Sequence, residues 1–267
     1  MKVKYSTIIY PAMFAIAAAL LGTGIGCSQS GTDSRHADSL IESSAKQSYV
    51  FRTYLKDDAI NIQSKDGVAT LTGTVAEDSH KALAQQTVES LPGVNSVNNQ
   101  IESKAERAPE NSDAWISAKV KATLMFHRNV SARNTQVEVQ NGIVTLRGEA
   151  ASQAQKELTT EYAKDAEGVK SVKNEIKVVE NPEKSAETMG ETMDNASINA
   201  QVKMTLLFHR STSMLNTTVD SKDGVVTLGG KAKNAAEKDL VTKLVTDIIG
   251  VKSVINNMTI EVSVTKN

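Results

Sequence analysis

Apolar and polar positions follow the same order three times along the chain. Each repeat opens with apolar residues about four positions apart, a spacing that predicts a helix with one buried face. The apolar positions are Ile41, Ala45, Phe51 and Leu55 in the first repeat, Ile116, Val120 and Leu124 in the second, and Ile198, Val202 and Leu206 in the third. In the second repeat Ser112 or Asp113 is the expected N-cap. The helix of the first repeat is expected to be longer and more polar.

After each helix, apolar and polar positions alternate around a turn signal: KDGVATLTG at 65–73, QNGIVTLRG at 140–148 and KDGVVTLGG at 222–230. An Asp-Gly or Asn-Gly pair between two such runs predicts a β-hairpin with a two-residue type I′ turn. The turn glycines are Gly67, Gly142 and Gly224. The expected facing pairs are Ile62 with Leu71 and Ser64 with Ala69, Gln140 with Ile143, Val139 with Val144 and Val137 with Leu146, and Val219 with Leu228 and Ser221 with Val226.

A second helix and a third strand complete each repeat. In AAEKDLVTKLVTDIIG at 235–250, an apolar stripe marks the helix, formed by Val241, Leu244, Val245 and Ile248. A glycine then stands 27 residues after the turn Asp or Asn in every repeat, at Gly93, Gly168 and Gly250, where a left-handed helix cap is expected. In the third strand, Asn99, Asn174 and Asn256 lie in phase with apolar neighbours. A structural asparagine that bonds the adjacent loop backbone is the expected role.

The order helix, strand, strand, helix, strand predicts an α+β fold. We expect three tandem αββαβ modules, each with a three-stranded sheet covered on one face by two helices. The modules are expected at 39–103, 112–179 and 194–262, separated by polar linkers at 104–111 and 180–193. Because domains of about 60 residues are near the lower size limit for a stable core, neighbouring modules are expected to pack together.

The N-terminus has the pattern of an export signal. Two lysines precede an apolar run at about 8–25, and a polar segment follows. A membrane-spanning helix is the alternative, but Pro11 and three glycines disfavour it. We therefore expect a signal peptide at 1–26, followed by a tether at 27–38.

Cys27 is the only cysteine, and it directly follows the apolar run. This position resembles the bacterial lipoprotein signal, in which the cysteine is lipidated. Gly26 fits that signal, whereas Gly24 stands where leucine is usual. Ser28 then implies sorting to the outer membrane. The alternative is a cleaved, soluble periplasmic protein whose cysteine has no role.

Composition and motifs argue against several function classes. The chain has 30 Lys and Arg against 31 Asp and Glu, so no positive excess indicates nucleic-acid binding. It contains no HExxH, phosphate-loop or GxSxG motif, so we predict no catalytic residue and no cofactor. Of four histidines, His127 and His209 occupy equivalent places and could share a metal only if their modules face each other. A helix-terminal role is favoured instead, and no metal is predicted.

The remaining candidate is a surface for a membrane or a partner. Trp115, Lys119, Phe126 and Arg128 lie beside the apolar stripe of the second module's first helix, and the third module offers Phe208 and Arg210. Aromatic residues next to cations are typical of insertion among lipid headgroups. The alternative, which is the commoner case, is that these aromatics pack against a neighbouring module.

The segment DGVVTLGG at 223–230, the following helix and GVKSVINNMTI at 250–260 closely resemble the BON (bacterial OsmY and nodulation) domain family. The stretch FHRSTSMLNTTVDSKDGVVTLGG at 208–230 resembles it over its full length. The first repeat lacks the FHR stretch, and three copies depart from the commoner two. The resemblance implies an exported bacterial protein with tandem α+β modules, associated with envelope integrity and osmotic or other stress. Some family members bind anionic phospholipid directly, so the resemblance also makes such binding an expectation here. It implies no enzyme activity.

Two functional hypotheses follow. The first is a non-enzymatic envelope protein, anchored in the periplasm to the outer membrane through Cys27, whose modules bind anionic phospholipid. The second is a soluble periplasmic stress protein or chaperone that binds other envelope proteins through sheet edges or the groove between modules.

Overall fold

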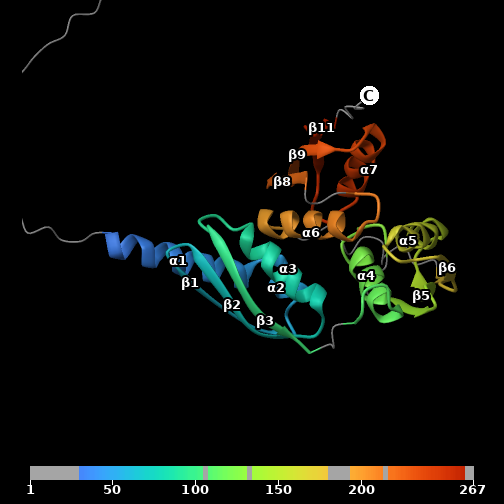
Figure 1. Cartoon of the computed structure of the whole chain (residues 1–267), viewed down its shortest axis with the longest axis horizontal. Coiled ribbons are helices and arrows are strands. Elements are labelled where there is room, and N and C mark those ends of the chain that lie inside the picture. Colours follow the sequence, from blue (N-terminus) through green and yellow to red (C-terminus); the bar gives the residue numbers. More distant parts are fainter. Residues whose placement is uncertain (1–29, 105–107, 131–133, 180–192, 213–215, 262–267) are drawn as a thin grey trace, which may run out of the picture.

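The computed structural model describes residues 30–104, 108–130, 134–179, 193–212 and 216–261. The expected signal peptide, Cys27 and most of the second linker lie outside these residues. Within them the chain forms three α+β modules, which confirms the predicted fold class (Figure 1). Among the described residues no helix combines the length and the apolar character needed to cross a membrane.

The helices and strands repeat in the predicted order. The first module contains α1 (Ser30–Gln47), α2 (Tyr49–Thr53), β1 (Ala59–Lys65), β2 (Val68–Val75), α3 (Asp78–Glu89) and β3 (Ser96–Ser103). The second contains α4 (Asp113–Met125), β4 (Thr135–Gln140), β5 (Ile143–Ala150), α5 (Gln153–Asp165), β6 (Ser171–Asn174) and β7 (Lys177–Val178). The third contains α6 (Asn195–Phe208), β8 (Thr217–Lys222), β9 (Val225–Ala232), α7 (Ala235–Thr246), β10 (Ser253–Asn256) and β11 (Thr259–Ile260).

Each sheet is a hairpin with one added parallel strand. The two hairpin strands pair antiparallel in all the predicted registers. The next strand pairs parallel with the second hairpin strand, and the intervening helix makes the crossover that a parallel pair requires. In the second and third modules this last strand is interrupted, so β6 and β7 pair separately with β5, and β10 and β11 with β9.

The hairpin turns have the predicted geometry. Asp66, Asn141 and Asp223 each have a φ of 53°, and the glycines that follow them have φ of 77°, 78° and 85°. Two consecutive positive φ angles are the signature of a type I′ turn. The first helix supports each turn: in the second module, Asp113 accepts the backbone N–H of Asn141 at 2.7 Å and of Gly142 at 2.8 Å.

The equivalent residues of the other modules act in the same way. Asp38 accepts the N–H groups of Asp66 and Gly67, and Asn195 accepts that of Asp223. These hydrogen bonds, led by the one from Gly67, hold the pKa of Asp38 below its ordinary value. Ser112 is the N-cap of α4 because its side chain accepts the N–H of Trp115.

The asparagine of the third strand bonds the adjacent backbone, as predicted for a structural role, and in every module it also bonds the second helix. In the second module Asn174 donates to the carbonyl of Lys156 at 2.8 Å and to the hydroxyl of Thr160 at 2.6 Å. Its own side-chain oxygen accepts the N–H of Ile176 at 2.9 Å. Asn99 and Asn256 make the equivalent bonds. The side chain therefore joins the second helix to the third strand.

Two local predictions need correction. The long first helix breaks at Ser48, whose side chain caps α2, and residues 30–38, assigned to a tether, are helical and belong to α1. The glycines that follow the turn Asp or Asn by 27 residues do have the expected left-handed backbone, with φ of 85° to 87° at Gly93, Gly168 and Gly250. However, they lie in the loop beyond the helix and not at its cap, because α3, α5 and α7 end earlier.

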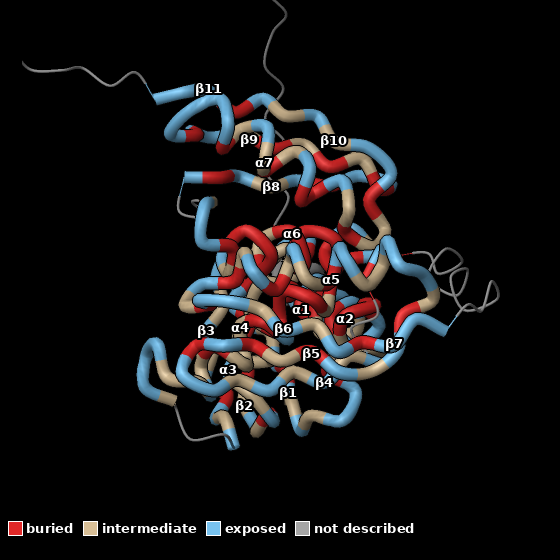
Figure 2. The backbone as a smooth tube through the Cα atoms, turned by 90° about the vertical axis from the view of Figure 1, so that its right-hand side faces the viewer, coloured by how far each residue is buried: buried red, intermediate tan, exposed pale blue. Residues whose placement is uncertain are grey.

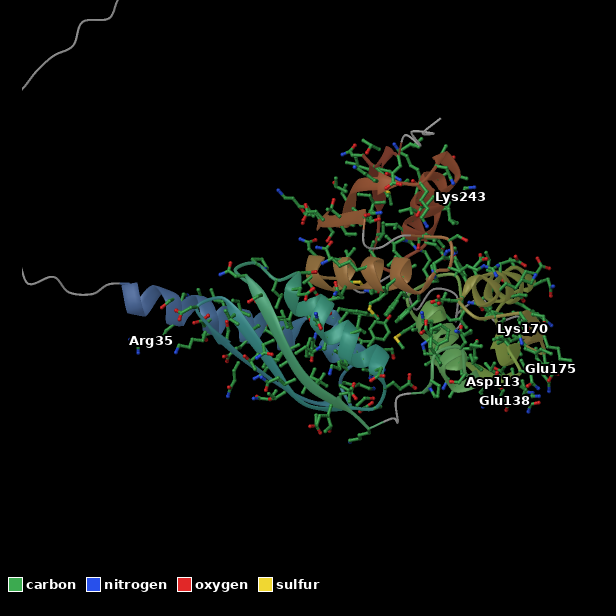
Figure 3. All side chains as sticks on the ribbon, viewed as in Figure 1. Arg35, Asp113, Glu138, Lys170, Glu175 and Lys243 are labelled. Carbon is green, nitrogen blue, oxygen red and sulfur yellow. The ribbon has the colours of Figure 1, made fainter. Side chains whose placement is uncertain are left out.

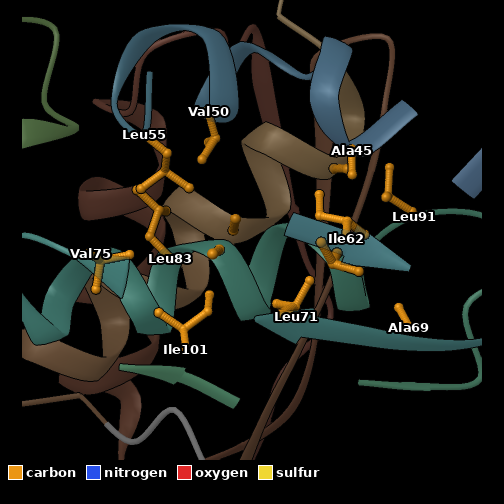
Figure 4. Close-up of a cluster of buried hydrophobic side chains, with 14 of the residues drawn as sticks. Ala45, Val50, Leu55, Ile62, Ala69, Leu71, Val75, Leu83, Leu91 and Ile101 are labelled. Carbon is orange, nitrogen blue, oxygen red and sulfur yellow. The ribbon is translucent and has the colours of Figure 1, made fainter. Parts of the chain in front are cut away.

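The hydrophobic cores are not confined to single modules. The first core contains Ile62, Leu71 and Leu83 of the first module (Figure 4), and it also includes Phe126, which follows α4, and Met204 from α6. Helix α6 lies between the first module and the third sheet (Figure 1), and most of its length is buried (Figure 2). The three modules therefore form one packed assembly around α6.

The first module is held to the third by hydrogen bonds at the start of α2. The N–H of Tyr49 donates to Asp194 at 2.7 Å, and the N–H of Val50 donates to the hydroxyl of Ser197 at 3.0 Å. Farther along α6, the ammonium of Lys203 donates to the hydroxyl of Ser90 at 3.3 Å. Burial lowers the pKa of Lys203, an effect that Glu89 partly offsets.

Candidate functional site at the junction of the second and third modules

The ends of α4 and α6 exchange equivalent contacts between the second and third modules. His127, just after α4, forms an antiparallel backbone bridge with Ile248 of the third module. His209, just after α6, forms the same bridge with Ala166 of the second module. His209 follows His127 by 82 residues, and Ile248 follows Ala166 by the same number, so equivalent residues of the two modules make the two bridges. The two modules therefore face each other in an approximately two-fold manner. We call residues 126–129, 165–166, 208–210 and 247–251 the reciprocal junction.

One half of the reciprocal junction joins the end of α4 to the loop after α7. The N–H of Arg128 donates to the carbonyl of Asp247 at 3.0 Å, and the N–H of Ile249 donates to the carbonyl of Phe126 at 3.0 Å. The guanidinium of Arg128 donates to the carbonyls of Ile248, at 2.8 Å, and Val251. A charged donor on two backbone carbonyls makes this half a directional contact.

The other half joins the end of α6 to the end of α5. The N–H of Arg210 donates to the carbonyl of Asp165 at 3.2 Å. The Arg210 guanidinium donates to the Asp165 carboxylate at 3.0 Å. This ion pair is the counterpart of the arginine contacts in the first half.

Both histidines are buried in the reciprocal junction. The His127 residue is 1% exposed, and its ring stacks on that of Tyr162 with centroids 3.8 Å apart and planes 15° apart. Its Nδ1 lies 3.3 Å from the Asp247 carboxylate but is not aligned for a hydrogen bond. His209 is 4% exposed, with Nε2 3.7 Å from the Asp165 carboxylate and Nδ1 accepting the N–H of Ser211 at 3.1 Å.

Burial and the neighbouring charges alter the titration of these groups. Burial lowers the pKa of His209 below its ordinary value, and Asp165 offsets this only in part. Burial raises the pKa of Tyr162 far above its ordinary value, and its hydroxyl donates to Asp247 at 2.6 Å. Burial alone would raise the pKa of Asp247, but His127, Tyr162 and Asn129 together lower it. These shifts favour the neutral form of His209 and the ionised form of Asp247.

The aromatic residues predicted for a contact surface converge here. Phe126 is 1% exposed and meets the ring of Tyr54 edge to face, with centroids 5.5 Å apart. The ammonium of Lys119 lies 4.2 Å from the Trp115 ring and 5.6 Å from the Phe208 ring, and it also pairs with Glu167. A cation between two aromatic rings from different modules is a cation–π contact that adds to their association.

Phe126, Arg128 and Arg210 contact a neighbouring module, as the packing alternative expected. Lys119 and Phe208 also meet across the two modules, and with Trp115 they are only partly buried. The three turn glycines, Gly67, Gly142 and Gly224, lie in the hairpin turns as predicted. Cys27 lies outside the described residues.

Sequence reasoning missed Asp165, Asp247 and Tyr162. A signal for the two aspartates exists, because each stands three residues before the loop glycine, as DAEG at 165–168 and DIIG at 247–250. The first repeat has SLPG at 90–93 and also lacks FHR. The two halves of the contact are thus present together or absent together in each repeat.

The described residues offer little for metal or cofactor chemistry. Across the described ranges, no group of three or more His, Cys, Asp or Glu side chains is arranged to hold a metal ion.

An open groove of about 570 Å³ runs between α1 and β1, and its charged lining residues are Glu42, Lys46 and Lys65. On the second module, Arg147 of β5 pairs with Glu138 of β4 and with Glu175, which directly follows β6, and the two glutamates lie on the side away from α6 (Figure 3).

Three α+β units joined through helices and loop ends define a protein built of tandem modules. The chain belongs to the BON domain family, whose model matches residues 37–105, 112–180 and 194–262. It is 35% identical over 146 residues to the Osmotically-inducible protein Y of Escherichia coli (strain K12), which covers 55% of this chain and 71% of that protein. It is 30% identical over 128 residues to a 21 kDa hemolysin of Actinobacillus pleuropneumoniae, covering 47% of this chain and 64% of that protein.

One solved structure aligns along much of the chain. It is CdsD, a structural protein of the type III secretion system of Chlamydia trachomatis, which is 16% identical and covers 86% of this chain and 92% of its own. The TM-score of 0.23 is too low to bear on the arrangement of the modules.

Proposed function

We propose that this chain is a non-enzymatic protein of the bacterial cell envelope that acts in the periplasm and supports envelope integrity under osmotic or other stress. The observation that carries the proposal is the set of three BON domains in a chain 35% identical to an osmotically inducible protein. The reciprocal junction holds the second and third modules together through its charged and aromatic groups, so these two modules would meet a membrane or a partner as one unit.

We further propose that Cys27 is acylated and holds the protein at the outer membrane. Cys27 lies three residues before α1, so the first module would stand close to the lipid surface. A buried acyl chain contributes about 0.8 kcal/mol per methylene, which gives durable attachment without a strongly charged domain. Labelling cells with a fatty-acid analogue should mark the wild-type protein, whereas Cys27→Ser should remain unlabelled and be released without detergent. Equal labelling of both proteins would rule out this anchor.

For the modules themselves we propose contact with anionic phospholipid at the margin of the reciprocal junction. Trp115, Lys119 and Phe208 lie there only partly buried, and Leu207, which precedes Phe208 on α6, is 48% exposed. Aromatic and aliphatic groups next to a cation suit the headgroup region of a membrane.

Vesicle flotation tests this contact in the unlipidated chain 28–267. We expect flotation with vesicles of anionic phospholipid at low salt, and about tenfold weaker binding for Trp115→Ala, equivalent to losing about 1.4 kcal/mol of apolar contact. The matched control is Leu40→Ala on α1, which removes a side chain that is 52% exposed in the first module. Wild-type protein that stays with the vesicle-free fraction, or equal losses for both variants, would contradict the lipid contact.

The alternative is a soluble periplasmic stress protein or chaperone that binds other envelope proteins. Strand β3 favours it, because in the described part of the chain this eight-residue strand lies at the edge of its sheet and pairs only with β2. An open strand edge accepts an extended peptide through backbone hydrogen bonds. Release of wild-type protein without detergent, together with unchanged behaviour of Cys27→Ser, would favour this alternative.

A further inference from the structure

We propose that the reciprocal junction is an acid-sensitive contact, in which protonation of His127 and His209 releases the third module from the second while the individual sheets stay folded. This inference does not depend on lipid binding or on acylation. It rests on where the two imidazoles lie and on what surrounds them.

The first support is the position of the two rings. Each histidine belongs to the backbone bridge that crosses between the modules, and the two residues are only 1% and 4% exposed. Among the described residues, no group is aligned to hydrogen-bond either ring nitrogen of His127 or the Nε2 of His209. A neutral imidazole tolerates this burial at a modest cost, whereas an imidazolium without aligned acceptors is strongly disfavoured.

The second support is that the nearby carboxylates are already engaged. Asp247 accepts the hydroxyl of Tyr162 and the side-chain N–H of Asn129, and Asp165 accepts the guanidinium of Arg210. The oxygen of Asp247 nearest His127 is the one that accepts the Tyr162 hydroxyl, and the oxygen of Asp165 nearest His209 is 3.7 Å from Nε2, beyond hydrogen-bond distance.

The charges of the reciprocal junction are also balanced when both rings are neutral. Asp165 at the end of α5 and Asp247 after α7 supply two negative charges. Arg128 after α4 and Arg210 after α6 supply two positive charges, and Tyr162 of α5 stays neutral. Protonation of both histidines would leave two uncompensated positive charges in a buried contact.

The direction of the pH effect follows from linkage. In the docked state the pKa of His209 is lowered, mainly by burial, whereas a released histidine titrates near pH 6.5. The released state therefore binds more protons as the pH falls below about 6.5, so docking is complete above that pH and weakens below it. Asp247, whose pKa is lowered, acts in the same direction only below about pH 4, where a released carboxyl protonates. The histidine effect is thus separated from general acid unfolding.

Hydrogen exchange on the mature chain can test the proposal directly. The backbone N–H groups of Arg128, Arg210 and Ile249 bond across the contact and report docking, whereas those of the central strands β5 and β9 report the sheets. After correction for the intrinsic exchange rate, we expect the protection of the three reporters to fall between about pH 7.5 and pH 5.5, by up to about tenfold for each histidine. The ceiling of about tenfold is reached when the docked ring stays neutral one pH unit below the pKa of the released ring. Protection in the two strands should not change.

Variants assign the effect to the two rings. The double variant His127→Gln, His209→Gln should keep constant reporter protection over this range, whereas the control His36→Gln, at an exposed position on α1, should behave as the wild type. Constant protection in the wild type, or an equal fall in the double variant, would overturn the proposal. If the double variant does not dock at neutral pH, the wild-type proton resonance titration of His209 decides: a pKa at or above about 6.5 would overturn the proposal.

Discussion

Replacing Phe126 with alanine is expected to lower the free energy of unfolding by about 3–5 kcal/mol, the range for a fully buried phenylalanine. The side chain is 1% exposed and lies in the core that joins α4 of the second module to α6 and to the first module. Its loss would leave a cavity beside Tyr54, whose ring it meets at 89°, where three modules share one core. Urea denaturation followed by circular dichroism measures the change.

The matched control for Phe126→Ala is Leu207→Ala on α6. Leu207 is 48% exposed, so its truncation should change the free energy of unfolding by less than about 1 kcal/mol. A loss below about 1 kcal/mol for Phe126→Ala itself would show that the modules do not depend on this shared core.

A second large effect is expected for Gly148→Ala in β5. Gly148 has a φ of 131°, and a Cβ there would overlap the carbonyl oxygen of Asn134, just before β4. Thr135 directly follows this carbonyl and is paired with Gly148, so the carbonyl cannot move away without disturbing that pair. We expect a loss of about 3 kcal/mol or more in the free energy of unfolding, with thermal denaturation as the measurement.

The control for Gly148→Ala separates steric overlap from backbone strain. Gly93 also has a positive φ, of 85°, but the nearest atom to a Cβ there is 3.7 Å away, on the Ile41 side chain. Gly93→Ala should therefore cost only the backbone strain, about 1–2 kcal/mol. Equal losses for the two variants would show that overlap with Asn134 contributes nothing.

The same geometry explains why the hairpin segments 65–73, 140–148 and 222–230 all end in glycine. Gly73 and Gly230 are equivalent to Gly148, with φ of 112° and 101°, and a Cβ on either would overlap the carbonyl oxygen of Ala59 or Asn216. The turn glycine was predicted from its role in the type I′ turn. This second glycine was not, because its constraint comes from the facing strand and becomes visible only when the strands are paired.

The environment that another module supplies could not be predicted from a local pattern. Gln201 and Asn199 are polar, yet they are buried in α6. For Phe126 and Arg128, the position beside the apolar stripe leaves both a membrane contact and packing against a neighbouring module open. In the structure they meet the first and third modules, whose approach no local pattern encodes.

The sequence by itself determined the repeated module, because alternation, helical spacing and Asp-Gly or Asn-Gly turns act over a few neighbouring residues. It thereby determined the hairpin registers, the strand asparagines and the family. Only the tertiary structure decided how the modules meet, since that depends on contacts such as His127 with Ile248 and His209 with Ala166 between residues far apart in the chain. The free energy of such contacts comes from burial and from charges of facing surfaces, and those surfaces exist only after each module has folded.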